Sequence, residues 1–213
     1  MSKVLILFAH PSQSRSEINV PLFKASHIEQ VTCVDLYSEY SNFRINIEKE
    51  QQRLLDHDVI VFMFPMYWYS TPAILKEWQD LVLEHGFAYG HDGNQLKGKK
   101  FLCAITAGGP ENAYQCDGMN HYGVHELLQP LEQMASLCGM HYIPPYVMFS
   151  ARTASEDQRI NKHVDQWTRT LSSMTNSQFD FEQATALKLL NPRETLTDGL
   201  IIDAHQTIKS EKQ

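Results

Sequence analysis

Five short segments of almost unbroken apolar residues recur along the 213-residue chain, and they constrain the fold more than any other feature. Each segment is rich in β-branched and aromatic residues, without the alternation that marks a strand with one solvated face. Strands buried on both faces of a parallel sheet have this composition. The predicted strands span residues 3–9, 30–36, 58–64, 100–106 and 142–149.

Helical patterns lie between these segments. One covers residues 71–87, where Gly86 is expected to end the helix. Another covers 124–140, which Pro130 should bend or split because proline lacks a backbone donor. A third helix is predicted to open with a capping box at residues 155–158. Its apolar stripe would consist of Ile160, Val164, Trp167 and Leu171.

Strand and helix alternate five times, which predicts a doubly wound α/β sandwich. Two strand orders compete, the flavodoxin-like order 2-1-3-4-5 and the dinucleotide-binding Rossmann order. We expect one domain over residues 1–175, followed by an appendage over 176–213 that is not an independent domain and could dock on a partner subunit. The appendage contains a short helical stretch at 182–190 and an apolar run at 200–202.

Composition excludes several function classes. The formal charge of −7 argues against nucleic acid as a partner and against general adsorption to anionic lipid. The N-terminal apolar run is too short for a signal peptide, and no run reaches the 18 residues of a membrane span. The four cysteines form no CxxC pair, so neither a disulfide framework nor a metal site is expected, and Cys33 and Cys103 are predicted core residues. The chain is expected to be cytoplasmic.

The loop after the first strand contains no glycine, whereas a Rossmann protein would carry G-x-G-x-x-G there. It offers Ser12, Ser14 and Ser16 beside His10 and Arg15, with a helix expected to begin near Ser16. Hydroxyls and free backbone N–H groups at a helix start suit one terminal phosphate rather than a bridging pyrophosphate. The alternative is an ordinary N-cap serine with solvated neighbours.

The ends of the third and fourth strands also carry unusual residues. Residues 66–69 are Met-Tyr-Trp-Tyr, set between two prolines, and could form a wall for a flat ring or simple hydrophobic padding. A phospho-acceptor receiver domain would need an aspartate at this strand end, and none is present. Residues 108–110 form a Gly-Gly-Pro turn, which either admits a ligand close to the backbone or is an ordinary loop.

Several of these segments resemble the flavodoxin-like NAD(P)H:quinone oxidoreductases, the DT-diaphorase family. The resemblance extends in particular to the small bacterial members that serve as ancillary subunits of glutathione-regulated potassium efflux systems. It runs from about residue 3 to residue 172. The segments that carry it are 7–11, 35–51, 57–78, 86–99 and 106–114.

The resemblance implies three groups of residues that bind a flavin: one at its phosphate, one against its ring and one at its pyrimidine end. These groups are His10, Ser16, Glu17, Ile18 and Asn19 for the phosphate; Met66, Tyr67, Trp68 and Tyr69 for the ring; and Ala107, Gly108, Gly109 and Pro110 for the pyrimidine end. The segment between Tyr37 and the third strand is shorter than in DT-diaphorase, which favours FMN over FAD.

The resemblance also implies the catalytic residues and the subunit arrangement. Tyr114 and His121 would face the reactive edge of the flavin, although the spacing between them is one residue longer than in DT-diaphorase. Tyr89 and His91 would form an aromatic lip over the site of a neighbouring subunit, which implies a homodimer.

The implied activity is hydride transfer from NADH or NADPH through the flavin to a quinone or another small electrophile. The alternative is a regulatory subunit that binds a membrane potassium efflux antiporter at the inner face of the membrane. Electron carriage by an ordinary flavodoxin fits less well, because the aromatic loop and the Tyr–His lip suit a stacked second substrate.

Overall fold

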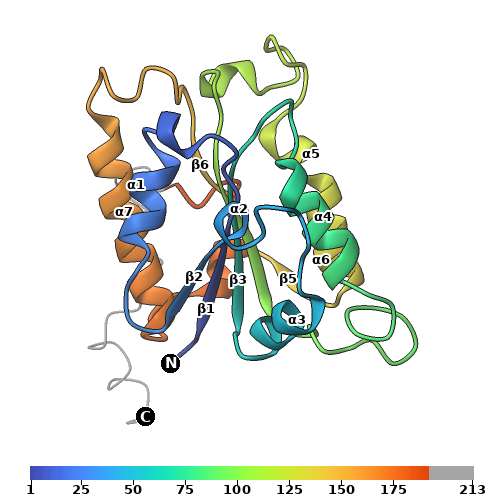
Figure 1. The fold of residues 1–213 in the computed structure, drawn as a ribbon. Coiled ribbons are helices and arrows are strands. Elements are labelled where there is room, and N and C mark those ends of the chain that lie inside the picture. The colour runs from blue at the N-terminus through green and yellow to red at the C-terminus, as the bar shows by residue number, and fades with distance from the viewer. Residues whose placement is uncertain (192–213) are drawn as a thin grey trace, which may run out of the picture.

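A parallel sheet lies between two layers of helices in the computed structural model, which describes residues 1–191 (Figure 1). The strands are β1 (Val4–Phe8), β2 (Val31–Asp35), β3 (Val59–Pro65), β4 (Lys100–Thr106), β5 (His141–Tyr142) and β6 (Tyr146–Met148). Their order is β2-β1-β3-β4-β5, and β6 also pairs with β4. All of these pairings are parallel. The flavodoxin-like order is therefore confirmed, and the Rossmann order is wrong.

The predicted fifth strand is wrong as one continuous element over 142–149. It is divided into β5 and β6 at Pro144 and Pro145, which lack the N–H groups that a sheet ladder requires. The outer side of β6 contacts a later part of the chain. The Asn191 side-chain amide accepts a hydrogen bond from the Val147 N–H at 2.6 Å and donates one to the Val147 carbonyl.

Two helices, α1 (Asn19–Ala25) and α7 (Arg159–Thr175), cover one face of the sheet (Figure 1). The longer helices on the other face are α3 (Ile47–Leu55), α4 (Ala73–Val82) and α6 (Gln129–Leu137). The short elements are α2 (Leu36–Glu39), α5 (Val124–Leu127), α8 (Phe181–Thr185) and the 3₁₀ turns η1 (Gln13–Arg15) and η2 (Glu111–Ala113).

Helix boundaries differ from expectation in two places. Helix α4 ends at Val82, well before Gly86, which lies in the following loop with a φ of 86°. The helix predicted over 124–140 is divided, as expected, into α5 and α6, with Pro130 at the start of α6, where a missing N–H is tolerated.

The predicted capping box at residues 155–158 is wrong. Residues 151–158 form turns, and α7 begins only at Arg159, after Gln158 adopts a left-handed φ of 57°. The apolar stripe of the helix is nevertheless correct, since Trp167 and Leu171 are fully buried. The structure describes the C-terminal segment as far as residue 191, and within that part the predicted stretch at 182–190 is helical only in α8, which ends at Thr185. The run at 200–202 lies outside the described residues.

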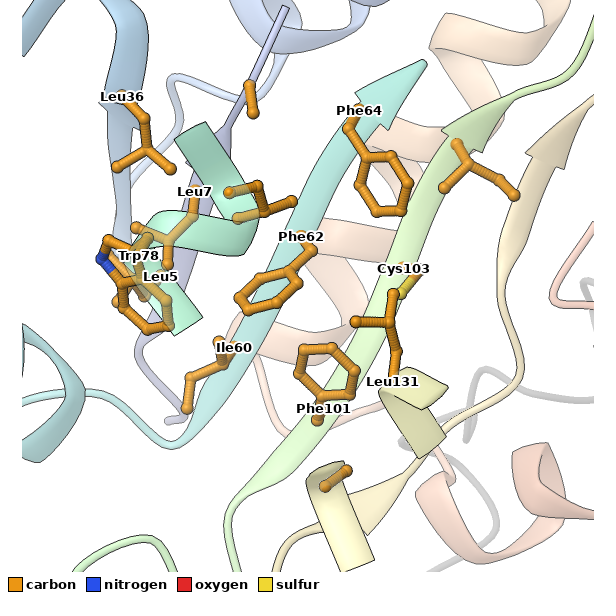
Figure 2. Packing of buried hydrophobic residues seen from close by; sticks show 14 of the residues in the cluster. Leu5, Leu7, Leu36, Ile60, Phe62, Phe64, Trp78, Phe101, Cys103 and Leu131 are labelled. Carbon is orange, nitrogen blue, oxygen red and sulfur yellow. The ribbon is translucent and has the colours of Figure 1, made fainter. Parts of the chain in front are cut away.

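The core has two parts because successive residues of each strand face opposite sides of the sheet. Leu5 and Leu7 of β1 belong to the cluster beneath α4 and α6 (Figure 2). In the same cluster the ring of Phe62 meets those of Trp78 and Phe101 edge-on, at 5.6 and 4.8 Å between centroids. Burying each such side chain contributes about 1.5–3 kcal/mol, so the strands and their ends are held firmly.

The second cluster lies beneath α1 and α7 and includes residues from the C-terminal segment. Phe179, Ala184 and Leu190 are buried within it, so residues up to 191 pack on the sheet of their own chain. All four cysteines are free; Cys103 is buried as predicted, and Cys33 is only partly buried.

Candidate functional site

A cavity of about 810 Å³ opens where the carboxyl ends of β1, β3 and β4 meet, the usual ligand position in open α/β sheets. The three loops singled out in the sequence supply most of its wall, and the β6–α7 loop supplies the rest. The lining residues are His10, Arg15, Ser16, Glu17, Ile18, Asn19, Pro65, Met66, Tyr67, Trp68, Tyr69, Thr106, Gly108, Gly109, Tyr114, Met119, Asn120, Ala151 and Arg152.

The helix of the first loop begins later than expected. Helix α1 starts at Asn19, and residues 16–18 separate it from the 3₁₀ turn η1 at Gln13–Arg15. Ser16 nevertheless acts on the helix start, since its Oγ accepts a hydrogen bond from the Val20 N–H at 3.1 Å. The Ser16–Asn19 segment thus follows the cavity wall in a fixed conformation.

His10 is buried at the base of this loop, with 4% of its surface exposed. Its Nδ1 lies 3.1 Å from the Ser12 N–H and accepts a hydrogen bond from it, which leaves the proton of the neutral ring on Nε2. Burial lowers the pKa of His10 below its ordinary value. The ring also meets Tyr67 edge-on, at 6.0 Å between centroids. His10 is therefore a neutral, oriented residue in the cavity wall.

Asn19 has an unfilled hydrogen-bonding position. Its Nδ2 donates to the Thr106 hydroxyl at 2.8 Å, while its buried Oδ1 has no partner among the described residues. An unpaired buried acceptor costs about 1–3 kcal/mol. Asn19 lines the cavity, so a ligand hydroxyl or N–H there would remove this cost.

The loop after β3 holds its aromatic residues in strained backbone conformations. Trp68 and Tyr69 both have left-handed φ angles, 50° and 63°, and the turn is closed by pairing of Tyr67 with Ser70. Strain of this kind concentrates at functional sites. Met66 is buried, but Trp68 is 93% exposed, which is inconsistent with hydrophobic padding. The loop instead presents aromatic surface at the mouth of the cavity.

The glycine turn after β4 forms a part of the cavity wall that carries no side chains. Gly108 and Gly109 line the cavity, whereas Ala107 is buried and Pro110 is exposed outside it. Gly109 lies beside the ring of Tyr114, since a Cβ built on Gly109 would be 3.4 Å from that ring, an ordinary packing distance. Backbone atoms therefore approach the cavity directly at this turn.

The two residues with implied catalytic roles differ in position. Tyr114 is half-buried, lines the cavity and packs against Phe149 at 5.6 Å between ring centroids. His121 is exposed, has a φ of 60° and does not line the cavity. Its neighbour Asn120 does, and its Oδ1 accepts a hydrogen bond from the Tyr69 hydroxyl at 3.0 Å.

The implied lip residues, Tyr89 and His91, lie in the loop before β4, at the opposite end of the sheet from the cavity (Figure 1). Tyr89 lines a separate groove between α4 and α6. The side chain of His91 is 95% exposed. Within one chain, neither residue contributes to the cavity.

The sequence interpretation missed several residues of the cavity wall. Thr106 was recognisable as the last residue of a buried strand next to the glycine turn. Met119, Asn120 and Arg152 lie in irregular loops, where spacing carries no signal. Among residues 1–191 no cluster of side chains could hold a metal ion. In the same range no helix combines the length and apolar character required to cross a bilayer.

Comparison with known proteins places this geometry in context. A sequence model of the family described as having a flavodoxin-like fold matches residues 2–171. The glutathione-regulated potassium-efflux system ancillary protein KefG of Cronobacter sakazakii is 50% identical over 155 residues, which are 72% of this chain and 84% of KefG.

Two solved structures are also similar. General stress protein 14 of Treponema denticola, in complex with FMN, is 33% identical with a TM-score of 0.76, over 81% of this chain and 99% of the other. An NADPH-quinone reductase from P. pentosaceus is 32% identical with a TM-score of 0.69, over 78% and 96%.

Proposed function

The chain belongs to the flavodoxin-like family, and on that basis we propose that it is an FMN-dependent oxidoreductase that passes electrons from NADH or NADPH to quinones or related electrophiles. The observation that carries the proposal is one cavity that combines an unsatisfied buried amide oxygen on Asn19, the glycine turn and a strained aromatic loop. Each feature accommodates a different part of a flavin nucleotide.

The residues present fit this cofactor. A volume of about 810 Å³ is within the range of small-molecule sites. Asn19 offers an acceptor for a sugar-alcohol hydroxyl, Gly108 and Gly109 admit a ring edge next to the backbone, and Tyr67 and Trp68 offer flat surfaces. FMN is favoured over FAD because the serine-rich loop suits one terminal phosphate and the segment before β3 is short. The complex of general stress protein 14 of Treponema denticola with FMN supports the same choice.

Bound FMN would supply reversible two-electron chemistry, taking hydride from NAD(P)H and passing it to the acceptor. The protein's contribution is position and electrostatics. Trp68 and Tyr69 would stack against a second flat substrate at the mouth of the cavity. The hydroxyl of Tyr114 would donate a hydrogen bond to a quinone oxygen that gains negative charge, and His121 would supply a proton.

A second candidate function is regulation of a potassium efflux antiporter, because the chain is 50% identical to a KefG ancillary protein. The protein would then bind the cytoplasmic side of a membrane partner, and any reductase activity would be secondary. Co-purification with such an antiporter, together with no turnover of menadione by the isolated protein, would favour this function over the enzyme.

A homodimer forms part of the proposal. Tyr89 and His91 lie at the far end of the sheet from their own cavity, so the implied role as a lip requires the cavity of a second copy. Two-fold pairing, the commonest arrangement of like chains, would bring each lip to the partner's site. A monomer by light scattering at micromolar concentration, with full activity, would contradict the dimer.

Two measurements on the purified protein test the function. The protein should be yellow and should release FMN on denaturation, as identified by mass spectrometry. It should also oxidise NADH or NADPH in the presence of menadione. Recovery of FAD would refute the choice of FMN, and failure to bind either flavin after reconstitution would refute the proposed enzyme.

A further inference from the structure

Two arginines line the cavity without an acidic partner. Arg15 comes from η1 and Arg152 from the β6–α7 loop, and neither side chain forms an ion pair or hydrogen bond with any of residues 1–191. The only acidic residue in the cavity wall is Glu17. In a chain with a formal charge of −7, this wall therefore carries an excess of positive charge.

The loop that carries Arg152 is tied to the glycine turn by backbone hydrogen bonds. The Ser150 N–H donates to the Gly109 carbonyl at 2.8 Å, and the Ala151 N–H donates to the Ala107 carbonyl at 3.0 Å. Ser150 adopts a left-handed φ of 51°, and the two residues after it, Ala151 and Arg152, line the cavity. Arg152 thus follows directly on a segment whose direction is fixed.

A third arginine is hydrogen-bonded to the same loop. Arg159, at the start of α7, donates from its guanidinium to the Phe149 carbonyl at 2.9 Å and the Ser150 carbonyl at 3.2 Å. Its Nε is paired with Asp157 at 2.7 Å. The guanidinium of Arg159 is therefore paired within the loop, whereas that of Arg152 is not. Arg159 serves to support the loop on which Arg152 is presented.

The Arg152 side chain lies against the glycine turn. A Cβ built on Gly108 would be 3.4 Å from Nε of Arg152 and 3.9 Å from Cζ and Nη2, an ordinary packing distance. One side of the guanidinium is thus supported by the turn, while its N–H donors have no partner among the described residues. A planar guanidinium held in this way is suited to phosphate oxygens, which it binds with two parallel hydrogen bonds.

We propose that Arg152, together with Arg15, binds a phosphate monoester carried by a nucleotide ligand of this cavity. The inference rests on the proposed function, which supplies two such groups: the 2′-phosphate of NADPH and the 5′-phosphate of FMN. Both arginines are exposed, which favours the ligand that enters and leaves, because an arginine near the ribose is a common means of accepting the 2′-phosphate. The protein would then prefer NADPH to NADH.

Direct binding measurements test this inference without recourse to turnover. NADP⁺ and NAD⁺ would be titrated into the flavin-loaded protein by calorimetry, and FMN and riboflavin into the apoprotein by flavin fluorescence. The variants are Arg152→Gln, Arg15→Gln and the double substitution. The matched control is Arg169→Gln, an exposed position on α7 outside the cavity wall that removes the same charge.

The expected result is a loss of about tenfold or more in NADP⁺ affinity for Arg152→Gln, with NAD⁺ affinity nearly unchanged. A selective loss of FMN relative to riboflavin would support the same phosphate site and assign it to the cofactor. The inference would be overturned if the double variant kept the parent's affinities for NADP⁺ relative to NAD⁺ and for FMN relative to riboflavin. Equal losses of affinity in Arg169→Gln would overturn it as well. If the parent protein binds none of these nucleotides, the proposed function itself fails.

Discussion

The Asn19 side-chain amide donates a hydrogen bond to the Thr106 hydroxyl at 2.8 Å, across 87 residues of sequence. It joins the start of α1 to the end of β4 and leaves the amide oxygen of Asn19 without a partner among the described residues. The contact both fixes the geometry of the cavity and leaves a vacant acceptor in its wall.

Replacement of Asn19 should therefore weaken flavin binding more than replacement of its partner. We expect Asn19→Ala to lower FMN affinity about tenfold or more, because it removes the side-chain oxygen that would accept a hydrogen bond from the ligand. Thr106→Val keeps that acceptor and should cause a smaller loss. Fluorescence titration of both variants measures the difference, and wild-type affinity in Asn19→Ala would show that Asn19 does not contact the cofactor.

The catalytic assignment is tested at Tyr114 and His121. Loss of one oriented donor to a developing oxyanion costs roughly 2–4 kcal/mol, so Tyr114→Phe and His121→Gln should each lower quinone-dependent turnover at least about tenfold, with water as a partial substitute. The flavin spectrum should not change. Stopped-flow measurement of the two half-reactions is the appropriate experiment.

Tyr114 and His121 lie at different positions relative to the cavity, so a comparison of their variants distinguishes their roles. Tyr114 lines the cavity, and His121 lies outside it in the single chain. A defect in Tyr114→Phe alone would assign the donor role to Tyr114 and remove His121 from the mechanism. A defect confined to flavin reduction by NAD(P)H would mean that these residues position the nicotinamide.

Stability should depend on a fully buried carboxylate beneath α4. Glu50 accepts hydrogen bonds from the Tyr40 hydroxyl at 2.6 Å and the Trp78 indole at 2.9 Å, and pairs with Arg53. Removing one partner of a buried pair typically costs about 3–5 kcal/mol, so Glu50→Gln should unfold at clearly lower urea concentration. Glu48→Gln, exposed on the same helix, removes the same charge and should unfold like the parent.

Stability should also fall in acid because of His163. Burial, and secondarily the charge of Arg159, lowers the pKa of His163 to about 3. The unfolded chain takes up this proton near pH 6.5, whereas the folded chain resists it, so the stabilisation is complete above pH 6.5 and is lost as pH falls toward 3.

The corresponding loss is at most about 1.4 kcal/mol per pH unit. His163→Leu removes the titrating group, so the stability of this variant relative to the parent should rise steadily as the pH is lowered through that window. Urea unfolding at several pH values measures the difference. If the free energy of unfolding changes with pH equally in the two proteins, His163 does not carry this pH dependence.

The positions of the strands could be predicted because burial on both faces leaves a strong mark on sequence, as in β3 and β4, whereas the choice between two strand orders followed from the family resemblance. The membership in a flavodoxin-like family that the quoted segments indicated is confirmed as well. The residues at which helices and strands begin and end could be predicted less well. The helix expected at residues 155–158 begins later because Gln158 adopts a left-handed conformation that its local sequence does not reveal.

The cavity wall was predictable where loop and strand end coincide, as at Met66 and Gly108. Asn120 and Arg152 escaped detection because neither lies in a pattern with a period, and both reach the cavity only through tertiary contacts. The hydrogen bond from Tyr69 to Asn120 and the packing of Arg152 on Gly108 exist only once distant loops meet.

The amide of Asn191 has a consequence for how molecules can associate. By offering an N–H and a C=O to Val147, it occupies backbone groups that an added strand would use on the outer side of β6. The two prolines before β6 lack backbone N–H donors, which removes further hydrogen-bonding groups from the same edge of the sheet. Exposed sheet edges of this kind are where strands of separate molecules pair and aggregate. This edge is closed to such growth by the chain itself, so copies that pair do not do so by adding a strand beside Val147 of β6.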